Sequence, residues 1–569
     1  MSVSISRVLV TTLATLGVAG GLYAQPTIAP DTLGVSLSAD LRVHAAALYA
    51  ADAGVRADAA CELGRLHDAA EPVIPLLVAL LGDTTDTPMV ECRIRQWAGR
   101  AISIDLLDGR QWPPTSPGEE AARALARIGR AAVSPTLDAL DSPVWGARMN
   151  AARALGRLDD SRAVEPLGRT LTDADARVRE QAAGALGRLD DTRAVEGLVN
   201  ALDDDAPEVR RAAAWALGRL DDSRAVTPLV STMDDADAAV REQAAWALGR
   251  IEDARAVPRL IGALADPAAN VQEQAAWALG RIEDQRATAA LGRVLTRPDP
   301  DGNVREQAAW ALGRIEDRSA IPALAATLTR PDPDPDVREQ AAWALGRIED
   351  ERAATALGRV LTRPDPDGDV REQAAWALGR IEGRAGIPAL AAALTRPDPD
   401  PDVREQAAWA LGRIEHADGL PGLFAGLRDP DGDVREQAAW ALGRIENEGA
   451  VDNLVATLTR PDPDAGVREQ AAWALGRIES RTATRGLIAG LADDDPEVRE
   501  QVIWALGRVR DPAATDALID ATRDDDRDVR EMAIRALARL DGSGGPNPNP
   551  NPNPNPNPNP NPNPSPPGE

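Results

Sequence analysis

One block, Val-Arg-Glu-Gln-Ala-Ala-Trp-Ala-Leu-Gly-Arg-Ile, recurs almost unchanged along the chain at a period of 31 or 33 residues. Its copies begin at Val240, Val304, Val337, Val370, Val403, Val434 and Val467. A unit of this length cannot bury its own apolar face and does so by stacking on its neighbours. The period therefore predicts a solenoid of stacked repeats and argues against a globular enzyme.

Two helices are predicted in each period. Residues 256–265 carry apolar side chains at helical spacing and form the first, helix A. The second, helix B, runs over residues 240–251, where Val240, Ala244, Ala247, Leu248 and Ile251 fall on one face. The predicted fold class is all-α, an α-solenoid of about 15–16 antiparallel helix pairs.

The start of helix B has its own signal. Asp369 precedes Val370 and Arg371, and Glu372 follows three residues after the aspartate, which is the spacing of a capping box. The same pattern begins at Asp336, Asp402 and Asp433. Helix B is therefore expected to begin at the valine.

The helix pairs resemble HEAT repeats, in particular those of the phycobilin lyase (PBS lyase) HEAT-like type. The residues that carry the resemblance are Val370-Arg371, Ala374-Ala375, Leu378-Gly379, Ile381 and, on helix A, the segment 193–198. The match covers about residues 41–540. It is specific for fold and weak for function, because this fold is a scaffold for many different sites.

The ends of the chain differ from the array. Residues 1–24 resemble a secretory signal peptide, with an uncleaved anchor as the alternative, and residues 25–40 form a lead-in. Irregular repeats with an insertion at 83–118 are expected over 41–130, and regular repeats over 131–540. Residues 541–569, which include nine Asn-Pro pairs, are predicted to be a disordered tail. The predicted location is periplasmic or secreted.

Two cysteines, Cys61 and Cys92, lie in the first irregular units. An exported protein permits a disulfide between them, which would fasten the end of the array. Two buried free thiols are the alternative.

A helical wheel places Glu242, Gln243, Trp246 and Arg250 on one face of helix B, away from the apolar set. The HEAT resemblance implies that helix B lines the concave side. Two interpretations stay open: an exposed series of indoles with a cation–π arginine one turn on, or indoles packed between neighbouring B helices. The candidate ligand-binding residues are Trp215, Trp246, Trp277, Trp310, Trp343, Trp376, Trp409, Trp440, Trp473, Trp504, Arg250, Arg314, Arg347, Arg380 and Arg413.

The sequence gives little support for calcium binding, catalysis or nucleic-acid binding. The Asp-rich loops at 365–369 and 429–433 resemble fragments of calcium loops, but a helix-capping role explains them better. Only His44, His67 and His416 occur, without the His-Glu pairs that resemblance to HEAT-repeat deoxyhypusine hydroxylases would require. No catalytic residue, metal site or cofactor is predicted, and the net charge of −27 disfavours nucleic acid.

The predicted function is a non-catalytic scaffold that binds a protein or peptide through the helix-B face of residues 209–509. A carbohydrate or cell-wall polymer binder and a passive spacer are the alternatives. The mature chain is expected to be a monomer without a membrane span.

Overall fold

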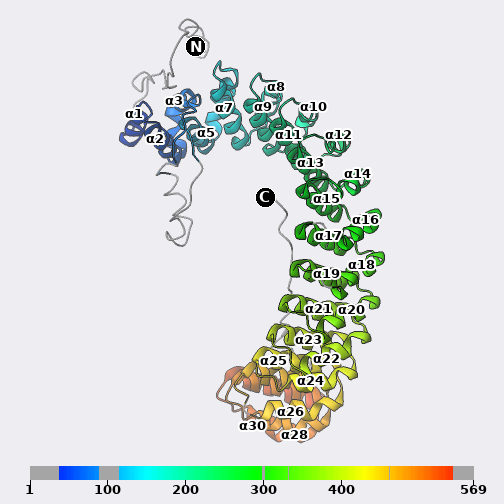
Figure 1. The fold of residues 1–569 in the computed structure, drawn as a ribbon. Helices are drawn as coiled ribbons and strands as arrows, with labels where there is room; N and C mark the ends of the chain where they lie inside the picture. The colour runs from blue at the N-terminus through cyan, green and yellow to red at the C-terminus, as the bar shows by residue number, and fades with distance from the viewer. Residues whose placement is uncertain are drawn as a thin grey trace. The chain divides into compact units, whose positions relative to one another are not determined.

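The computed structural model describes residues 37–88, 92, 114–297, 301–330, 332–460 and 462–542. The predicted signal peptide (1–24), most of the lead-in (25–40), most of the insertion (83–118) and the tail beyond residue 542 lie outside the described residues. Within them the chain is a succession of helix pairs, with 3₁₀ turns before the A helices and one isolated β-bridge (Figure 1). The predicted all-α solenoid is confirmed.

The helices group into two compact units, Met1–Ile251 and Glu252–Glu569. In the first unit the A helices are α1 (Ala39–Ala47), α3 (Ile74–Leu80), α6 (Val133–Asp138), α8 (Val164–Thr170), α10 (Val195–Ala201) and α12 (Val226–Thr232). Its B helices are α2 (Ala53–Arg65), α5 (Pro117–Ile128), α7 (Trp145–Leu158), α9 (Ala176–Arg188), α11 (Pro207–Leu220) and α13 (Ala238–Ile251).

In the second unit the labelled A helices from α14 to α22 run along one side and the labelled B helices from α15 to α23 along the other (Figure 1). The A helices are α14 (Val257–Ala263), α16 (Thr288–Thr296), α18 (Ile321–Thr329), α20 (Ala354–Thr362), α22 (Ile387–Thr395), α24 (Leu420–Gly426), α26 (Val451–Thr459), α28 (Thr484–Gly490) and α30 (Thr515–Ala521). The B helices are α15 (Ala269–Ile282), α17 (Gly302–Ile315), α19 (Pro335–Ile348), α21 (Gly368–Ile381), α23 (Pro401–Ile414), α25 (Gly432–Ile445), α27 (Ala465–Ile478), α29 (Pro496–Val509) and α31 (Arg527–Leu540).

The core is aliphatic and small. Val240, Ala244, Ala247 and Leu248 are buried, as their spacing predicts, and Ile251 is half-buried. The short alanine side chains let neighbouring B helices approach closely, which is how an array with few aromatic residues buries its apolar surface.

The predicted capping box is wrong by two residues. Asp367, not Asp369, is the N-cap of α21, and its carboxylate accepts from the N–H of Asp369 (3.0 Å) and of Val370 (3.3 Å). The helix therefore begins at Gly368, and the N–H that Glu372 would have capped is already bonded. The same shift occurs in α19, α23 and α25, whose N-caps are Asp334, Asp400 and Asp431.

Candidate functional site

The tryptophans of helix B lie between neighbouring repeats. In the second unit Trp277, Trp310, Trp343, Trp376, Trp409, Trp440 and Trp504 are only 5–8% exposed. Trp473 there, and Trp215 and Trp246 in the first unit, are half-buried. Of the two interpretations left open by the sequence, the burial favours packing between B helices over an exposed series of indoles.

A glycine on the preceding helix makes room for each ring. A Cβ added at Gly379 of α21 would lie 2.6 Å from Cζ3 of Trp409 and 2.9 Å from Cα of Ala410, both on α23. No real side chain fits at such distances, so the Leu-Gly-Arg motif needs its glycine for close approach. We call this contact the Trp–Gly seam; the glycines that meet a following tryptophan in this way are Gly187, Gly218, Gly280, Gly313, Gly346, Gly379, Gly412, Gly443 and Gly476.

The glutamine of the repeated block is also buried in the seam between B helices. Gln373 and Gln406 are no more than 1% exposed. Gln373 hydrogen-bonds the side chain of Glu339, one repeat earlier, and Gln406 bonds Glu372 in the same way. A helical wheel treats each helix alone. It therefore could not show that the glutamine side of helix B packs against a neighbouring B helix.

The arginine that follows the glycine stays at the surface. In the second unit each pairs with a glutamate just past the end of the preceding B helix, as Arg347 does with Glu316. Arg347 is 38% exposed and Glu316 is 47% exposed. The pairs are Arg281–Glu252, Arg314–Glu283, Arg347–Glu316, Arg380–Glu349, Arg413–Glu382, Arg444–Glu415, Arg477–Glu446 and Arg508–Glu479.

The predicted cation–π contact is present at several of these arginines. In the second unit the guanidinium carbon lies 5.8–5.9 Å from the indole one turn earlier, for Arg281, Arg444, Arg477 and Arg508. In the first unit Arg250 lies 6.0 Å from Trp246. Each arginine covers the edge of the seam.

The structure contains a second series of ion pairs, which was not predicted from the sequence. Arg371, the second residue of its block, donates from Nε and Nη2 to both carboxylate oxygens of Asp398, each at 2.9 Å. Its Nη1 donates to the Asp365 carbonyl at 2.6 Å, and both side chains of the pair are buried. The bidentate geometry is the strongest form of this interaction. A Val-Arg dipeptide followed 25 or 27 residues later by an aspartate was the available signal.

This series accounts for the Asp-rich loops. The carboxylate of Asp365 accepts a hydrogen bond from Nε of Arg338, and that of Asp429 accepts one from Nε of Arg404, at 2.8 Å in each case. Asp367 and Asp431 are N-caps. Four of the carboxylates considered for calcium, those of Asp365, Asp367, Asp429 and Asp431, therefore have partners in the protein.

An acidic column runs beside the seam in the second unit. Burial raises the pKa of Glu306, Glu339 and Glu405 to about 7, and an aspartate of the next repeat adds to the rise. The neighbours are Asp336 for Glu306, Asp369 for Glu339 and Asp433 for Glu405.

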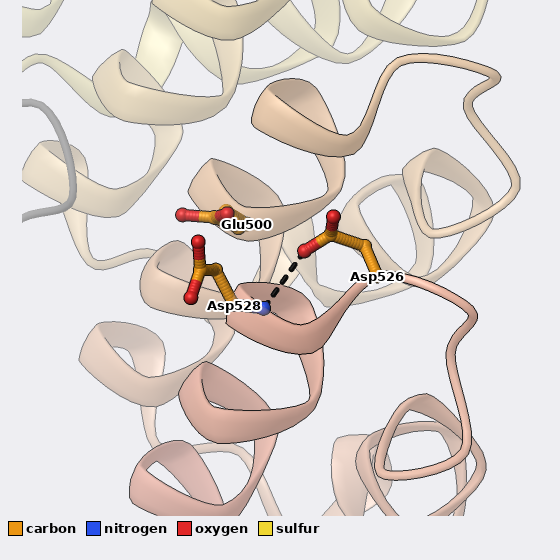
Figure 2. A group of neighbouring side chains, drawn as sticks. All are labelled: Glu500, Asp526 and Asp528. Carbon is orange, nitrogen blue, oxygen red and sulfur yellow. Dashed lines mark hydrogen bonds between the residues drawn. The ribbon is translucent and has the colours of Figure 1, made fainter.

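One further acidic group has the spacing of metal ligands. Glu500, Asp526 and Asp528 each offer an oxygen, and these oxygens lie within 4.8 Å of one another (Figure 2). Asp526 is the N-cap of α31 and accepts from the N–H of Asp528 at 2.8 Å. Helix capping therefore explains the position of Asp526.

Near the N-terminal end, Cys61 of α2 is joined to Cys92 by a disulfide, with the two Cα atoms 6.1 Å apart. The N–H of Cys92 also donates to Asp58 at 2.8 Å. The histidines take part in local contacts: His67 Nδ1 lies 3.2 Å from the Arg127 carbonyl, and His416 accepts from the N–H of Asp418.

None of the described helices is long and apolar enough to cross a membrane.

Comparison with known proteins gives a family and several structures. The family described as HEAT repeats matches residues 117–175, 164–237, 226–302, 290–379, 359–424, 387–476, 420–492 and 484–546. Among curated proteins the comparison found no match.

Three solved structures illustrate the similarity. A chain from a structure of Kap95p binding to RanGDP is 15% identical, with 90% of this chain and 77% of that chain covered and a TM-score of 0.48. A chain from a structure on the interaction between cadherin and β-catenin is 16% identical, with 66% and 100% covered and a TM-score of 0.33. Human deoxyhypusine hydroxylase is 29% identical, with 50% and 97% covered and a TM-score of 0.22.

Proposed function

Since this chain belongs to the HEAT-repeat family, we propose that it is a non-catalytic scaffold that binds a protein partner along its helix-B face. The proposed contact surface lies within residues 209–509 and corresponds to the concave side of HEAT-like arrays. The phycobilin lyase-like type of repeat stays part of this proposal.

The observation that carries the proposal is what the Trp–Gly seam leaves exposed. In the second unit most of the indoles and glutamines are packed between helices. The groups open to a partner are an arginine and a glutamate that recur in successive helix pairs. Charged groups of both signs at a regular spacing favour selection of a protein by electrostatic complementarity. A carbohydrate binder would need open ring faces, and side chains only 5–8% exposed do not offer them.

Export is the second part of the proposal. A signal peptide at residues 1–24 would direct the chain to the periplasm or the medium. The disulfide between Cys61 and Cys92 supports this location, because disulfides persist in oxidising compartments and are rare in the cytosol.

The absence of lysine from the sequence allows a direct test. The mature chain, from residue 25, is incubated with a cell-envelope extract and treated with a carbodiimide, which joins carboxylates to amines. Any lysine in a crosslink then comes from the partner. The expected crosslinks lie on the glutamates that pair with the surface arginines, such as Glu316, Glu349 and Glu382.

Two variants control the experiment. Glu316→Gln, Glu349→Gln and Glu382→Gln together should remove most crosslinks. The matched set Glu351→Gln, Glu448→Gln and Asp452→Asn, at exposed positions near the A helices, should leave them. Crosslinks confined to the A-helix side, or none above those of the heat-unfolded chain, would contradict the proposal.

A further inference from the structure

Three arginines of the first unit occupy the same place as the paired arginines of the second. Arg157 of α7, Arg188 of α9 and Arg219 of α11 each follow the glycine of helix B and are exposed. Among the described residues none of the three has an ion-pair partner in its own unit; Arg188 donates instead to the Gly184 carbonyl of its own helix, at 2.8 Å. We call Arg157, Arg188 and Arg219 the arginine strip.

The residue past the end of the preceding B helix explains the difference. In the second unit it is a glutamate in the left-handed conformation, such as Glu316 with φ 54°, and its carboxylate reaches the arginine of the next repeat. In the first unit Asp159 and Asp190 take the same conformation, with φ 51° and 50°. Aspartate is one methylene shorter, and neither side chain forms the pair.

Before Arg157 the residue after the preceding B helix is not acidic at all. The corresponding residue before it is Gly129, with φ 85°. The first unit therefore keeps the arginines of the column, and the carboxylates before them are either too short to pair, as in Asp159 and Asp190, or replaced by Gly129.

The electrostatics agree with this geometry. Desolvation by the neighbouring side chains lowers the pKa of Arg157 to about 10, although its residue surface is exposed; the charges of Arg123, Arg153 and Arg188 lower the pKa further and Glu119 opposes the fall. The pKa of Arg188 is lowered first by burial and then by Arg153 and Arg219. Since like charges shift a pKa in this way only at short range, the guanidinium groups of Arg157, Arg188 and Arg219 lie near one another along the strip.

We propose that the arginine strip binds an acidic segment of a protein partner, whose carboxylates take the places that glutamates hold in the second unit. This inference rests on the proposed scaffold function, names the chemistry of its partner and extends the contact surface to Arg157 and Arg188, which precede residue 209. The same side chain, at the same position of the same helix, already binds a carboxylate eight times in the second unit.

Spacing is compatible with a polypeptide. Packed helices lie about 8–10 Å apart. In the polyproline II conformation a chain advances about 3.1 Å per residue with three residues per turn, so acidic side chains three positions apart share one face and lie about 9 Å apart. The net charge of −27 disfavours long phosphate polymers, since they would meet a repulsive field beyond the strip.

The test measures binding of a fluorescein-labelled oligoglutamate peptide to the full mature chain by fluorescence anisotropy at low salt. Arg157→Gln, Arg188→Gln and Arg219→Gln together should weaken binding by about tenfold, since each exposed pair contributes modestly. The matched set Arg314→Gln, Arg347→Gln and Arg380→Gln should change it less than about twofold, because those arginines are already paired.

A second variant keeps all the arginines. The double variant Asp159→Glu and Asp190→Glu lengthens each side chain by one methylene, so that its carboxylate can pair with Arg188 or Arg219. Peptide binding should then weaken, because these two arginines are already paired. This conservative change decides the question if the triple arginine variant fails to fold. Unchanged binding in the aspartate variant, or an equal loss in the matched set, would overturn the inference.

Single-stranded DNA of similar charge is the competing probe. Binding of DNA as tight as that of the peptide, with the same variant dependence, would also overturn it. If the carbodiimide experiment finds a partner on the second unit while peptide binding does not depend on the strip variants, the scaffold function stands and the arginine strip fails.

Discussion

The two units use the same helix pair and differ by a few side chains. In Glu252–Glu569 a glutamate follows each B helix from α15 to α27, and its carboxylate pairs with the arginine of the next B helix. In Met1–Ile251 the corresponding residues are Asp159, Asp190 and Asp221, and among the described residues they form no ion pair with the arginines that follow, Arg188, Arg219 and Arg250, which instead lie beside Trp215 or Trp246. One methylene per repeat therefore separates a neutralised column from a positive one on the same backbone.

The seam differs as well. The position that holds tryptophan in the second unit is Arg123 in α5, Arg153 in α7 and Gly184 in α9. Gly156 of α7 still meets Ala185 of α9, at 2.7 Å from an added Cβ to its Cα, so the close approach of B helices persists without a ring. Small residues set the distance between repeats, and tryptophan fills the edge that this approach leaves.

The largest effect should come from removing a buried ring. Trp343→Ala is expected to reduce the free energy of unfolding of the second unit by about 3–5 kcal/mol, because the ring is 8% exposed and leaves a cavity against Gly313. Chemical denaturation followed by circular dichroism measures it. A loss below about 1 kcal/mol, the range of surface substitutions, would restore the open-face interpretation.

Removing one partner of the buried ion pair should cost nearly as much. Arg371→Ala leaves Asp398 buried without its cation, at an expected cost of about 3–5 kcal/mol. Arg148→Ala in the first unit breaks a more exposed pair with Asp173 and should cost less. Equal losses for Arg371→Ala and for the exposed control Arg352→Ala would show that burial is not the cause.

The glycine of the seam should tolerate no side chain. Gly379→Ala places a methyl group 2.6 Å from the Trp409 ring and should destabilise the second unit by about 1–3 kcal/mol. Gly168→Ala on α8, where an added Cβ meets nothing within 4 Å, should instead stabilise the first unit by up to about 1 kcal/mol. Thermal unfolding of both variants compares them.

The fold was largely predictable from the sequence and the site was not. Val240, Ala244, Ala247 and Leu248 lie on the face that their spacing predicts, because burial against helix A is a property of one helix pair. The burial of Trp343 and Gln373 depends on the next repeat, which a wheel drawn for one helix omits. The pairing of Arg371 with Asp398 spans 27 residues and could not be read from local spacing.

Asp367 shows a subtler limit. An Asp-Gly-Asp segment offers two possible N-caps, and the choice depends on how the loop is held. Arg371 binds the carbonyls of Asp365 and Asp367, at 2.6 and 3.0 Å, which fixes the loop with Asp367 at the cap.

A further effect concerns pH. Glu306, Glu339 and Glu405 have pKa values near 7 in the folded second unit, above that of an unfolded glutamate. The folded state then binds more protons than the unfolded state between about pH 4.5 and 7, so stability should rise as pH falls through this window. In the first unit Glu180 has a raised pKa, but Arg211 opposes the rise.

The thermal midpoint of the chain should therefore increase between about pH 8 and pH 5, and the increase should shrink in a Glu306→Gln, Glu339→Gln and Glu405→Gln variant. A midpoint that falls over this range in the parent chain would contradict the assignment.

The most direct test of the Trp–Gly seam is acrylamide quenching of tryptophan fluorescence, in a chain with Trp97→Phe, Trp112→Phe and Trp145→Phe, so that only the ten helix-B tryptophans emit. Because seven of these ten are buried, most of the emission should be quenched far less than free tryptophan, with a minor accessible fraction from Trp215, Trp246 and Trp473. Uniform quenching close to that of free tryptophan would mean that the indoles form an open surface.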